Sequence, residues 1–203
     1  MKKRYSLLLG ATALALAPAA AMAERGASGH LNIIYWQAPS TLNPYLSGGT
    51  KEVESASLIL ESLARFNQDG TITPWLAESV PTVENGGISE DLTSITWTIA
   101  EGVTWSDGSA LTAADFVFTW TYCTHPEGGC AQSSYFDGVT SVDAVDARTV
   151  RVNFAEPTPF PYTAFVGSES PVIQAAQFAD CIGARAPECT DANFGPIGTG
   201  PFV

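Results

Sequence analysis

The stretch from Leu60 to Trp120 constrains the fold most, because turn, strand and helix signals follow one another closely there. Every second residue of Ile95–Ile99 is large and apolar, which predicts a strand with one buried face. Asp107-Gly108 is a tight-turn sequence, and Thr112 with Asp115 forms a capping box that begins a helix. The pattern predicts a mixed α/β (α+β) domain.

Short elements separated by glycine, proline and asparagine make up the rest of the chain. We expect a helix after a Thr50 cap that ends near Arg65. Its predicted buried face consists of Val53, Ala56, Leu60 and Leu63, and its polar positions are Lys51, Glu52, Glu54 and Glu61. Other expected elements are a strand over Leu31–Trp36, a strand over Thr71–Thr73 after a turn at Asn67–Gly70, a hairpin of Val139–Asp146 with Thr149–Phe154, and a helix over Ile173–Cys181. The strand at Ile95–Ile99 is expected to pair with Val103–Trp105 or with a strand at Phe66.

The first 23 residues have the three-part pattern of a secretory signal peptide. Residues 2–4 are basic, residues 5–17 are mostly apolar, and Ala21-Met22-Ala23 supplies the small residues of a cleavage site. A membrane anchor is the alternative, but Pro18 interrupts the segment and no stop-transfer flank follows. We therefore expect export to the periplasm with cleavage near Ala23.

The charge balance of the chain narrows the possible partners. It contains 21 acidic and 9 basic residues, a formal net charge of −12. Cleavage of the signal peptide would remove basic residues only and make the chain more acidic. Nucleic acids and anionic membranes are bound through basic surfaces, so neither is expected as a partner.

The chain has 4 cysteines, and export would allow them to form disulfides. Cys123 and Cys130 flank a Pro/Gly turn, and Cys181 and Cys189 flank a second short loop. Four cysteines allow three pairings, of which the two local pairs are the simplest. The alternative is a metal site at Cys123, His125 and Cys130, which the lack of a Cys-x-x-Cys spacing disfavours.

No arrangement of residues typical of catalysis is evident. The sequence lacks a nucleophile elbow, a phosphate loop, a dinucleotide fingerprint and an HExxH helix. Its two histidines, His30 and His125, do not suit a Ser-His-Asp arrangement. We expect a protein that is not an enzyme and that needs no metal or cofactor.

The last residues, Gly195–Val203, form a Gly/Pro loop that leads into the start of an apolar strand. The backbone of a strand needs hydrogen-bond partners. This pattern predicts that the sequence is the N-terminal portion of a longer protein.

A set of short motifs occurs in a fixed order along the chain: Asn43-Pro44, Leu60–Leu63, Asp69-Gly70, Pro74–Ser79, Trp97–Ile99, Gly102–Gly108, Leu111–Trp120 and Pro196–Phe202. Together they resemble the family 5 extracellular solute-binding proteins, the peptide- and dipeptide-binding receptors of ABC importers. The resemblance covers Leu31–Val203, and its specificity lies in the order of the motifs.

The resemblance implies a periplasmic-binding-protein-like (type II) fold, in which two α/β lobes close on a ligand and a subdomain is inserted in the first lobe. It divides the chain into a signal peptide at 1–23, the start of lobe I at 24–48, an inserted α/β subdomain at 49–192 and a return to lobe I at 193–203. The second lobe would be absent from this sequence.

The same resemblance implies that the protein captures di- and oligopeptides in the periplasm and delivers them, as a monomer, to the membrane permease subunits of an ABC importer. An extended peptide can be bound through its backbone hydrogen bonds. The residues expected to contact it are Gln37, Ala38, Pro39 and Ser40 after the first strand, and Ser47, Gly48, Gly49 and Thr50 before the helix.

Ordinary loop chemistry explains these two segments equally well. Within the family, nickel, haem or a sugar are alternative ligands. An exported structural or adhesion domain stabilised by disulfides is the alternative from another class of protein, and an exported hydrolase is a third.

Overall fold

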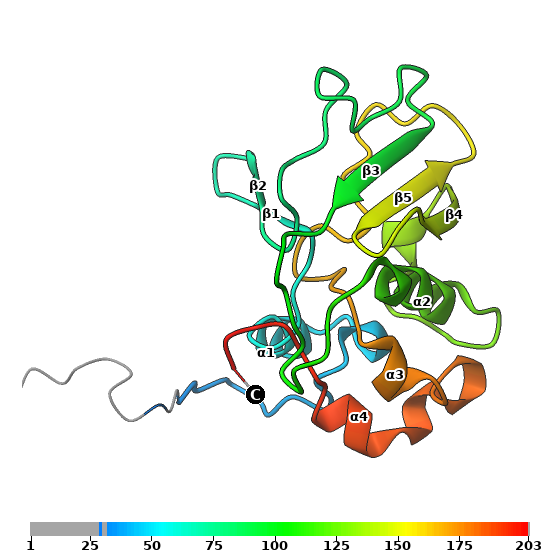
Figure 1. Cartoon of the computed structure of the whole chain (residues 1–203). Coiled ribbons are helices and arrows are strands. Elements are labelled where there is room, and N and C mark those ends of the chain that lie inside the picture. Colours follow the sequence, from blue (N-terminus) through cyan, green and yellow to red (C-terminus); the bar gives the residue numbers. More distant parts are fainter. Residues whose placement is uncertain (1–28, 30–31, 203) are drawn as a thin grey trace, which may run out of the picture. The chain divides into compact units, whose positions relative to one another are not determined.

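The computed structural model describes Gly29 and residues 32–202, so the predicted signal peptide lies outside the described residues. The chain divides into two units, Met1–Ile34 and Tyr35–Val203, and every described helix and strand belongs to the second (Figure 1). Within the described part of the chain, no helix combines the length and the hydrophobicity that a membrane crossing requires.

A three-stranded antiparallel sheet with the order β3-β5-β4 forms the upper part of this unit in Figure 1. Its strands are β3 (Ser94–Thr98), β4 (Val139–Ala144) and β5 (Thr149–Phe154). The buried pair Trp97 and Val150 lies opposite in register, as do Ile95 and Val152. The apolar face of the sheet packs against the long helix α2 (Ala113–Thr124).

The predicted strand at Ile95–Ile99 and the predicted hairpin that follows Val139 are both confirmed. The predicted partners of the Ile95–Ile99 strand are wrong. β3 pairs with β5, because β5 carries the matching alternation of buried residues, whereas Thr104 near Val103–Trp105 forms only a local bridge with Ala110. The strand β5 lies more than 50 residues after β3 in the sequence, so the pattern of residues near β3 does not reveal this pairing.

The capping box of α2 also has a tertiary role. The Thr112 backbone N–H donates to Asp115 Oδ2 over 2.9 Å, and the other carboxylate oxygen of Asp115 accepts from the backbone N–H of Ala175 over 3.0 Å. One buried carboxylate thus begins α2 and fixes the start of α3 (Ala175–Phe178).

The predicted helix from Thr50 to Arg65 is wrong in its length and its cap. Helix α1 covers only Thr50–Ala56, with Gly49 at the N-cap. The chain then enters β1 (Ala64–Phe66), which pairs with β2 (Ile72–Pro74) across the predicted turn. This pairing and a parallel bridge from Ala64 to Val166 supply partners that a longer helix would exclude. The predicted buried residues are buried, but Glu52 and Glu61, predicted to be polar surface positions, are buried as well.

Two further expected elements also differ. No strand forms over the described residues of Leu31–Trp36, and Ile34 and Trp36 are 96% and 73% exposed. The described part of the chain offers no strand to pair with this segment. The expected helix over Ile173–Cys181 is reduced to the single turn of α3, followed by η3 (Gly183–Glu188) and α4 (Thr190–Phe194).

Both local disulfides form, Cys123–Cys130 with a Cα–Cα distance of 5.1 Å and Cys181–Cys189 with 5.9 Å. The alternative metal site at Cys123, His125 and Cys130 is therefore wrong, because the two cysteine sulfurs form a disulfide and are not available as thiolate ligands. The two disulfide loops also touch: a Cβ at Gly183 would lie 2.7 Å from the His125 ring. Glycine at this position lets the loops pack together.

The Gly-Thr-Gly motif, Gly198-Thr199-Gly200, crosses the backbone at Ile59, a few residues after α1 ends. Gly200 N donates to Ile59 O over 2.8 Å, and Ser106 N donates to Gly198 O over 2.8 Å. A Cβ on Gly198 would overlap the Ile59 carbonyl. The motif is therefore a close backbone crossing that only glycine allows.

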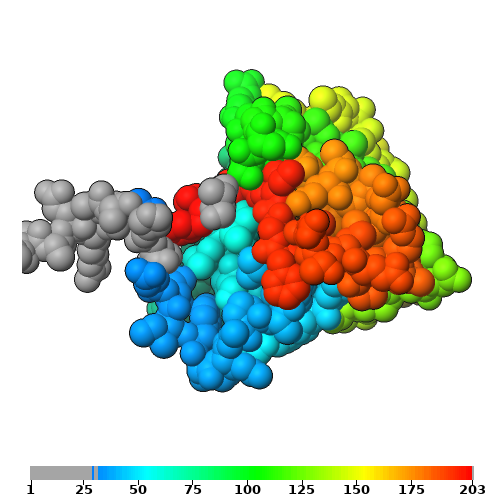
Figure 2. All heavy atoms as spheres, turned by 90° about the horizontal axis from the view of Figure 1, so that it is seen from below, coloured from blue at the N-terminus to red at the C-terminus, as the bar shows by residue number. Residues whose placement is uncertain are grey.

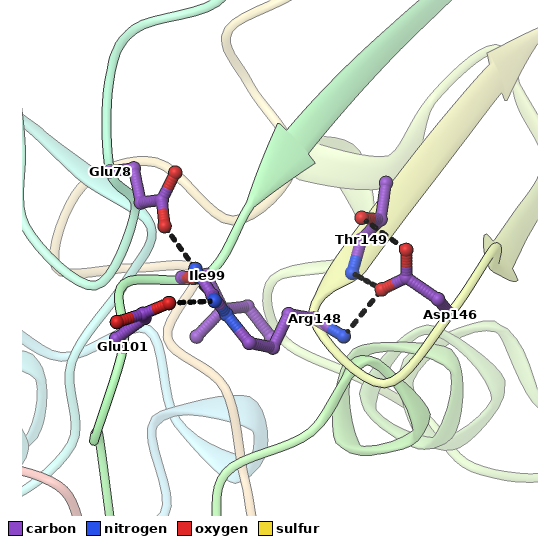
Figure 3. Close-up of polar contacts among 6 residues, drawn as sticks. All are labelled: Glu78, Ile99, Glu101, Asp146, Arg148 and Thr149. Carbon is purple, nitrogen blue, oxygen red and sulfur yellow. Dashed lines mark hydrogen bonds and ion pairs between the residues drawn. The ribbon is translucent and has the colours of Figure 1, made fainter.

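The bend between β4 and β5 is fixed by Asp146 and Arg148 (Figure 3). Asp146 Oδ1 accepts from the backbone N–H groups of Arg148 and Thr149, both over 2.8 Å. The Arg148 guanidinium donates to Ile99 O over 2.9 Å and pairs with Glu78 and Glu101. These groups are largely exposed and belong to the scaffold, where such ion pairs contribute little.

Replacing Cys181 and Cys189 together by serine should lower the free energy of unfolding by about 2–3 kcal/mol, because the short loop gains freedom in the unfolded chain. Urea unfolding followed by circular dichroism measures this. A reducing agent should lower the free energy of unfolding of the native protein and should not change that of a variant without any cysteine. Reaction of the native protein with a thiol reagent would contradict the pairing.

Candidate functional site

The buried amide of Asn43 joins the segment before α1 to the end of the described chain. Its Nδ2 donates to Tyr122 Oη over 3.0 Å and to Asn193 Oδ1 over 2.9 Å, and its Oδ1 accepts from Tyr45 N over 3.0 Å. Asn193 O in turn accepts from Leu42 N over 2.8 Å. In the space-filling view, the blue segment before α1 and the orange-red segment of α4 lie side by side (Figure 2).

Glu52 fixes the two loops on either side of this junction. Its Oε1 accepts from the backbone N–H of Ser40 over 2.8 Å and from the Ser40 hydroxyl over 2.7 Å, and it pairs with Lys51. Gly49 lies so close that a Cβ there would overlap Glu52 Oε2. The carboxylate of Glu52 therefore holds the loop at Ser40 to α1, and the backbone at Gly49 packs closely against it.

The environment of Glu52 keeps it ionised. Burial opposes ionisation, but the hydrogen bonds from Lys51 and from Ser40 outweigh it and lower the pKa of the carboxyl from 4.5 to about 2. For Tyr122, burial raises the pKa and the contact with Asn43 partly offsets this. Its hydroxyl stays protonated at neutral pH and remains available for hydrogen bonding.

These contacts border a cavity of about 280 Å³ between the loops and α4. It is lined by Ser40, Thr41, Leu46, Ser47, Pro187, Thr190, Asn193 and Phe194. Two of the expected ligand-contact residues, Ser40 and Ser47, are brought together here. The other six do not line this cavity: Gln37, Ala38, Pro39, Gly48, Gly49 and Thr50.

Several residues of this site were not anticipated from the sequence. Asn43 is predicted only as part of the Asn43-Pro44 motif of the resemblance, and Thr190, Asn193 and Phe194 lie about 150 residues from it. Glu52 was expected on a polar surface. A signal for Glu52 was nonetheless present, because a glutamate in the first turn of a helix is well placed to accept hydrogen bonds from the preceding loop.

The chemistry of this cavity suits binding. Its walls offer hydroxyls and apolar surface, whereas the Asn193 amide and the nearby carboxylate of Glu52 are already occupied. Over residues 32–202, no group of three or more His, Cys, Asp or Glu side chains is placed to hold a metal ion. The fold and the cavity thus define a mixed α/β protein with a polar pocket between loops.

Comparison with known proteins identifies the family. Residues 71–203 match the sequence profile of the bacterial extracellular solute-binding proteins, family 5 (middle). The chain belongs to this family of solute-binding proteins, whose members act outside the cytoplasm.

Two curated relatives illustrate the likeness. Protein XP55 of Streptomyces lividans is 31% identical over 167 residues, which cover 81% of this chain and 28% of that protein. Oligopeptide-binding protein OppA of Bacillus subtilis (strain 168) is 30% identical over 145 residues, which cover 64% of this chain and 26% of OppA. The chain thus spans less than a third of the length of either relative.

Solved structures share the fold. AppA from Bacillus subtilis, in complex with a nonapeptide, aligns with a TM-score of 0.70 at 20% identity, covering 81% of this chain and 31% of that one. NikZ from Campylobacter jejuni, in complex with Ni(L-His), aligns with a TM-score of 0.65 at 23% identity, covering 81% and 30%. The expected fold class is confirmed by these alignments: a mixed α/β portion of a periplasmic binding protein.

Replacing Glu52 by Gln should lower the free energy of unfolding by about 1–2 kcal/mol at neutral pH, because hydrogen bonds to a charged acceptor become bonds to a neutral one. The pKa is lower in the folded state, so this stabilisation is present above pH 4.5 and is lost as the pH falls toward 2. Chemical unfolding from pH 7 to pH 2 measures it. Glu54→Gln, on the exposed side of α1, is the control, and an equal loss in both variants would contradict the role of Glu52.

Replacing Gly49 by Ala should destabilise the protein by about 1–3 kcal/mol, because the added methyl group would overlap the fixed carboxylate of Glu52. Gly48→Ala is the matched control, since its Cβ would lie 3.9 Å from the nearest atom, Gln132 Nε2. In thermal unfolding, Gly49→Ala should have a lower Tm than the native protein, whereas the Tm of Gly48→Ala should change little. Equal Tm values for the two variants would show that the short distance between Gly49 and Glu52 does not contribute to stability.

Proposed function

We propose that the protein captures peptides outside the cytoplasm and delivers them to the membrane permease of an ABC importer. The observation that carries this proposal is the cavity at Ser40 and Ser47, which is polar, carries no free acid or base and is held open by Glu52 and Asn43. The OppA relative and the AppA–nonapeptide complex support a peptide as the ligand.

The remaining expected contacts fit this function as exposed loop positions. Gln37, Ala38 and Gly48 are exposed on the loops beside Glu52, and Thr50 is the exposed first residue of α1. A peptide could receive backbone hydrogen bonds from these loops, which gives affinity without a demand on its sequence. The protein then acts as a monomeric receptor without catalysis, and a second lobe would complete the ligand site.

The same reasoning supports the proposed division of the chain. Residues 1–23 would direct export to the periplasm, 24–48 and 193–203 would belong to the ligand-binding lobe, and 49–192 would form the inserted subdomain. The hydrogen bonds between residues 41–43 and Asn193 support this assignment, because they join the two proposed lobe segments.

Another small solute is the second candidate. NikZ binds Ni(L-His) with a similar fold, so the fold by itself does not select a peptide. The cavity in this chain favours the peptide, since its hydroxyl lining suits peptide groups and its described residues include no metal-ligating cluster.

A thermal-shift panel of dipeptides, oligopeptides, Ni(L-His) and sugars tests the ligand class. Peptides should stabilise the protein, by about 2.7 kcal/mol at a hundred times Kd, and Ser40→Ala with Ser47→Ala should weaken the effect. Ser134→Ala, an exposed position away from the cavity, is the control. A shift with Ni(L-His) or a sugar and none with any peptide would overturn the proposal.

A further inference from the structure

A second cavity, of about 270 Å³, lies beside the β1–β2 hairpin and shares no lining residue with the first. Its walls include Glu61, Arg65, Phe66, Gly167, Ser168 and Glu169. Neither the family likeness nor the proposed peptide site gives this cavity a role. It combines one basic group, acidic groups and an aromatic ring within a volume suited to a small molecule.

The two walls of this cavity are tied together by backbone contacts. Leu63 N donates to Phe165 O and Gly167 N donates to Ala64 O, each over 2.9 Å. Phe165 has a φ of 61°, an unusual conformation for a bulky residue, which its buried ring and a 2.9 Å bond from its N–H to Ser170 Oγ maintain. The backbone of both walls is therefore held in place before any ligand arrives.

On one wall, Arg65 lacks a strong carboxylate partner. Its guanidinium stacks 3.5 Å from the centroid of the Trp75 ring and, among the described residues, donates one long bond of 3.4 Å to Glu61 Oε1. Glu61 is already bound by Trp75 Nε1 over 2.5 Å and by Thr199 Oγ1 over 3.0 Å. Guanidinium groups favour paired hydrogen bonds to a carboxylate, and this single long ion pair with Glu61 leaves other N–H groups of Arg65 available to a ligand carboxylate.

On the other wall, Gly167 and the acid Glu169 lie close to the aromatic ring of Phe66, which belongs to β1. A Cβ at Gly167 would lie 3.5 Å from Glu169 Oε2 and 3.7 Å from Phe66 Cδ2. The half-buried Glu169 and the 47% exposed Phe66 ring therefore border the same space. Phe66 is supported from behind by a stacked Phe160, with the ring centroids 6.4 Å apart. This wall offers a partner for an ammonium group next to an apolar surface.

We propose that this cavity binds a free amino acid with an apolar or aromatic side chain. Its α-carboxylate would pair with Arg65, its ammonium group with Glu169, and its side chain would lie on Phe66. A simple anion would be repelled by Glu61 and Glu169 and by a chain with a net charge of −12. A zwitterion satisfies both signs of charge.

Titration of the ¹⁵N-labelled protein with L-phenylalanine, followed by NMR, tests this site. Amide shifts should change at Phe66, Gly167 and Ser168 with millimolar affinity. N-acetyl-L-phenylalanine, which lacks the ammonium group, and L-phenylalaninamide, which lacks the carboxylate, should each bind more weakly by about tenfold. Shifts confined to Ser40 and Ser47, no shifts at all, or equal binding of the three compounds would overturn the proposal.

Variants of the cavity give a second test that does not depend on the peptide site. Arg65→Met and Glu169→Gln should each weaken L-phenylalanine binding by about tenfold or more. Arg151→Met and Glu156→Gln, exposed residues outside the cavity, are the matched controls. Unchanged binding in both cavity variants would refute the site. If Arg65→Met fails to fold, the Glu169 variant and the three ligands still decide the question. Peptide binding should be unaffected in Glu169→Gln, so this site and the peptide site can fail separately.

Discussion

The buried amide of Asn43 is the interaction on which the rest of this structure depends. It binds Tyr45 beside it, Tyr122 on α2 and Asn193 on α4, and thereby connects three segments that are far apart in sequence. A buried amide is costly to leave without partners, so each of these segments must be in place for the amide to be satisfied. The cavity proposed to bind peptide lies directly beside this junction, and its shape follows from it.

Buried carboxylates have a related role elsewhere in the molecule. Glu52, Glu61 and Asp115 are all buried, and each accepts hydrogen bonds from more than one segment of the chain. Glu52 joins the loop at Ser40 to α1, Glu61 joins the hairpin to the Gly-Thr-Gly crossing, and Asp115 joins α2 to α3. In a small α/β unit with short elements, these acids supply the connections that longer helices and wider sheets provide by packing.

Local signals in the sequence predicted the elements that depend on nearby residues. The capping box of α2, the turn between β1 and β2, the β4–β5 hairpin and the short disulfide loops follow from residues within about ten positions of one another. The errors arose where distant residues decide the outcome. The partner of β3 is set by Val150 and Val152, and α1 ends early because β1 finds partners in β2 and at Val166. Ser40 and Ser47 could be proposed from the resemblance, but their neighbour Asn193 could not, because only the folded chain brings it there.

The junction between Asn43 and Asn193 has a consequence for how the chain is made. The two residues are separated by 150 positions, and the Gly-Thr-Gly crossing closes against Ile59 later still in the sequence. Contacts of such long sequence separation form slowly, and they cannot form before the ribosome has released the later partner. The segment before α1 therefore waits without these partners until about 150 further residues have been synthesised.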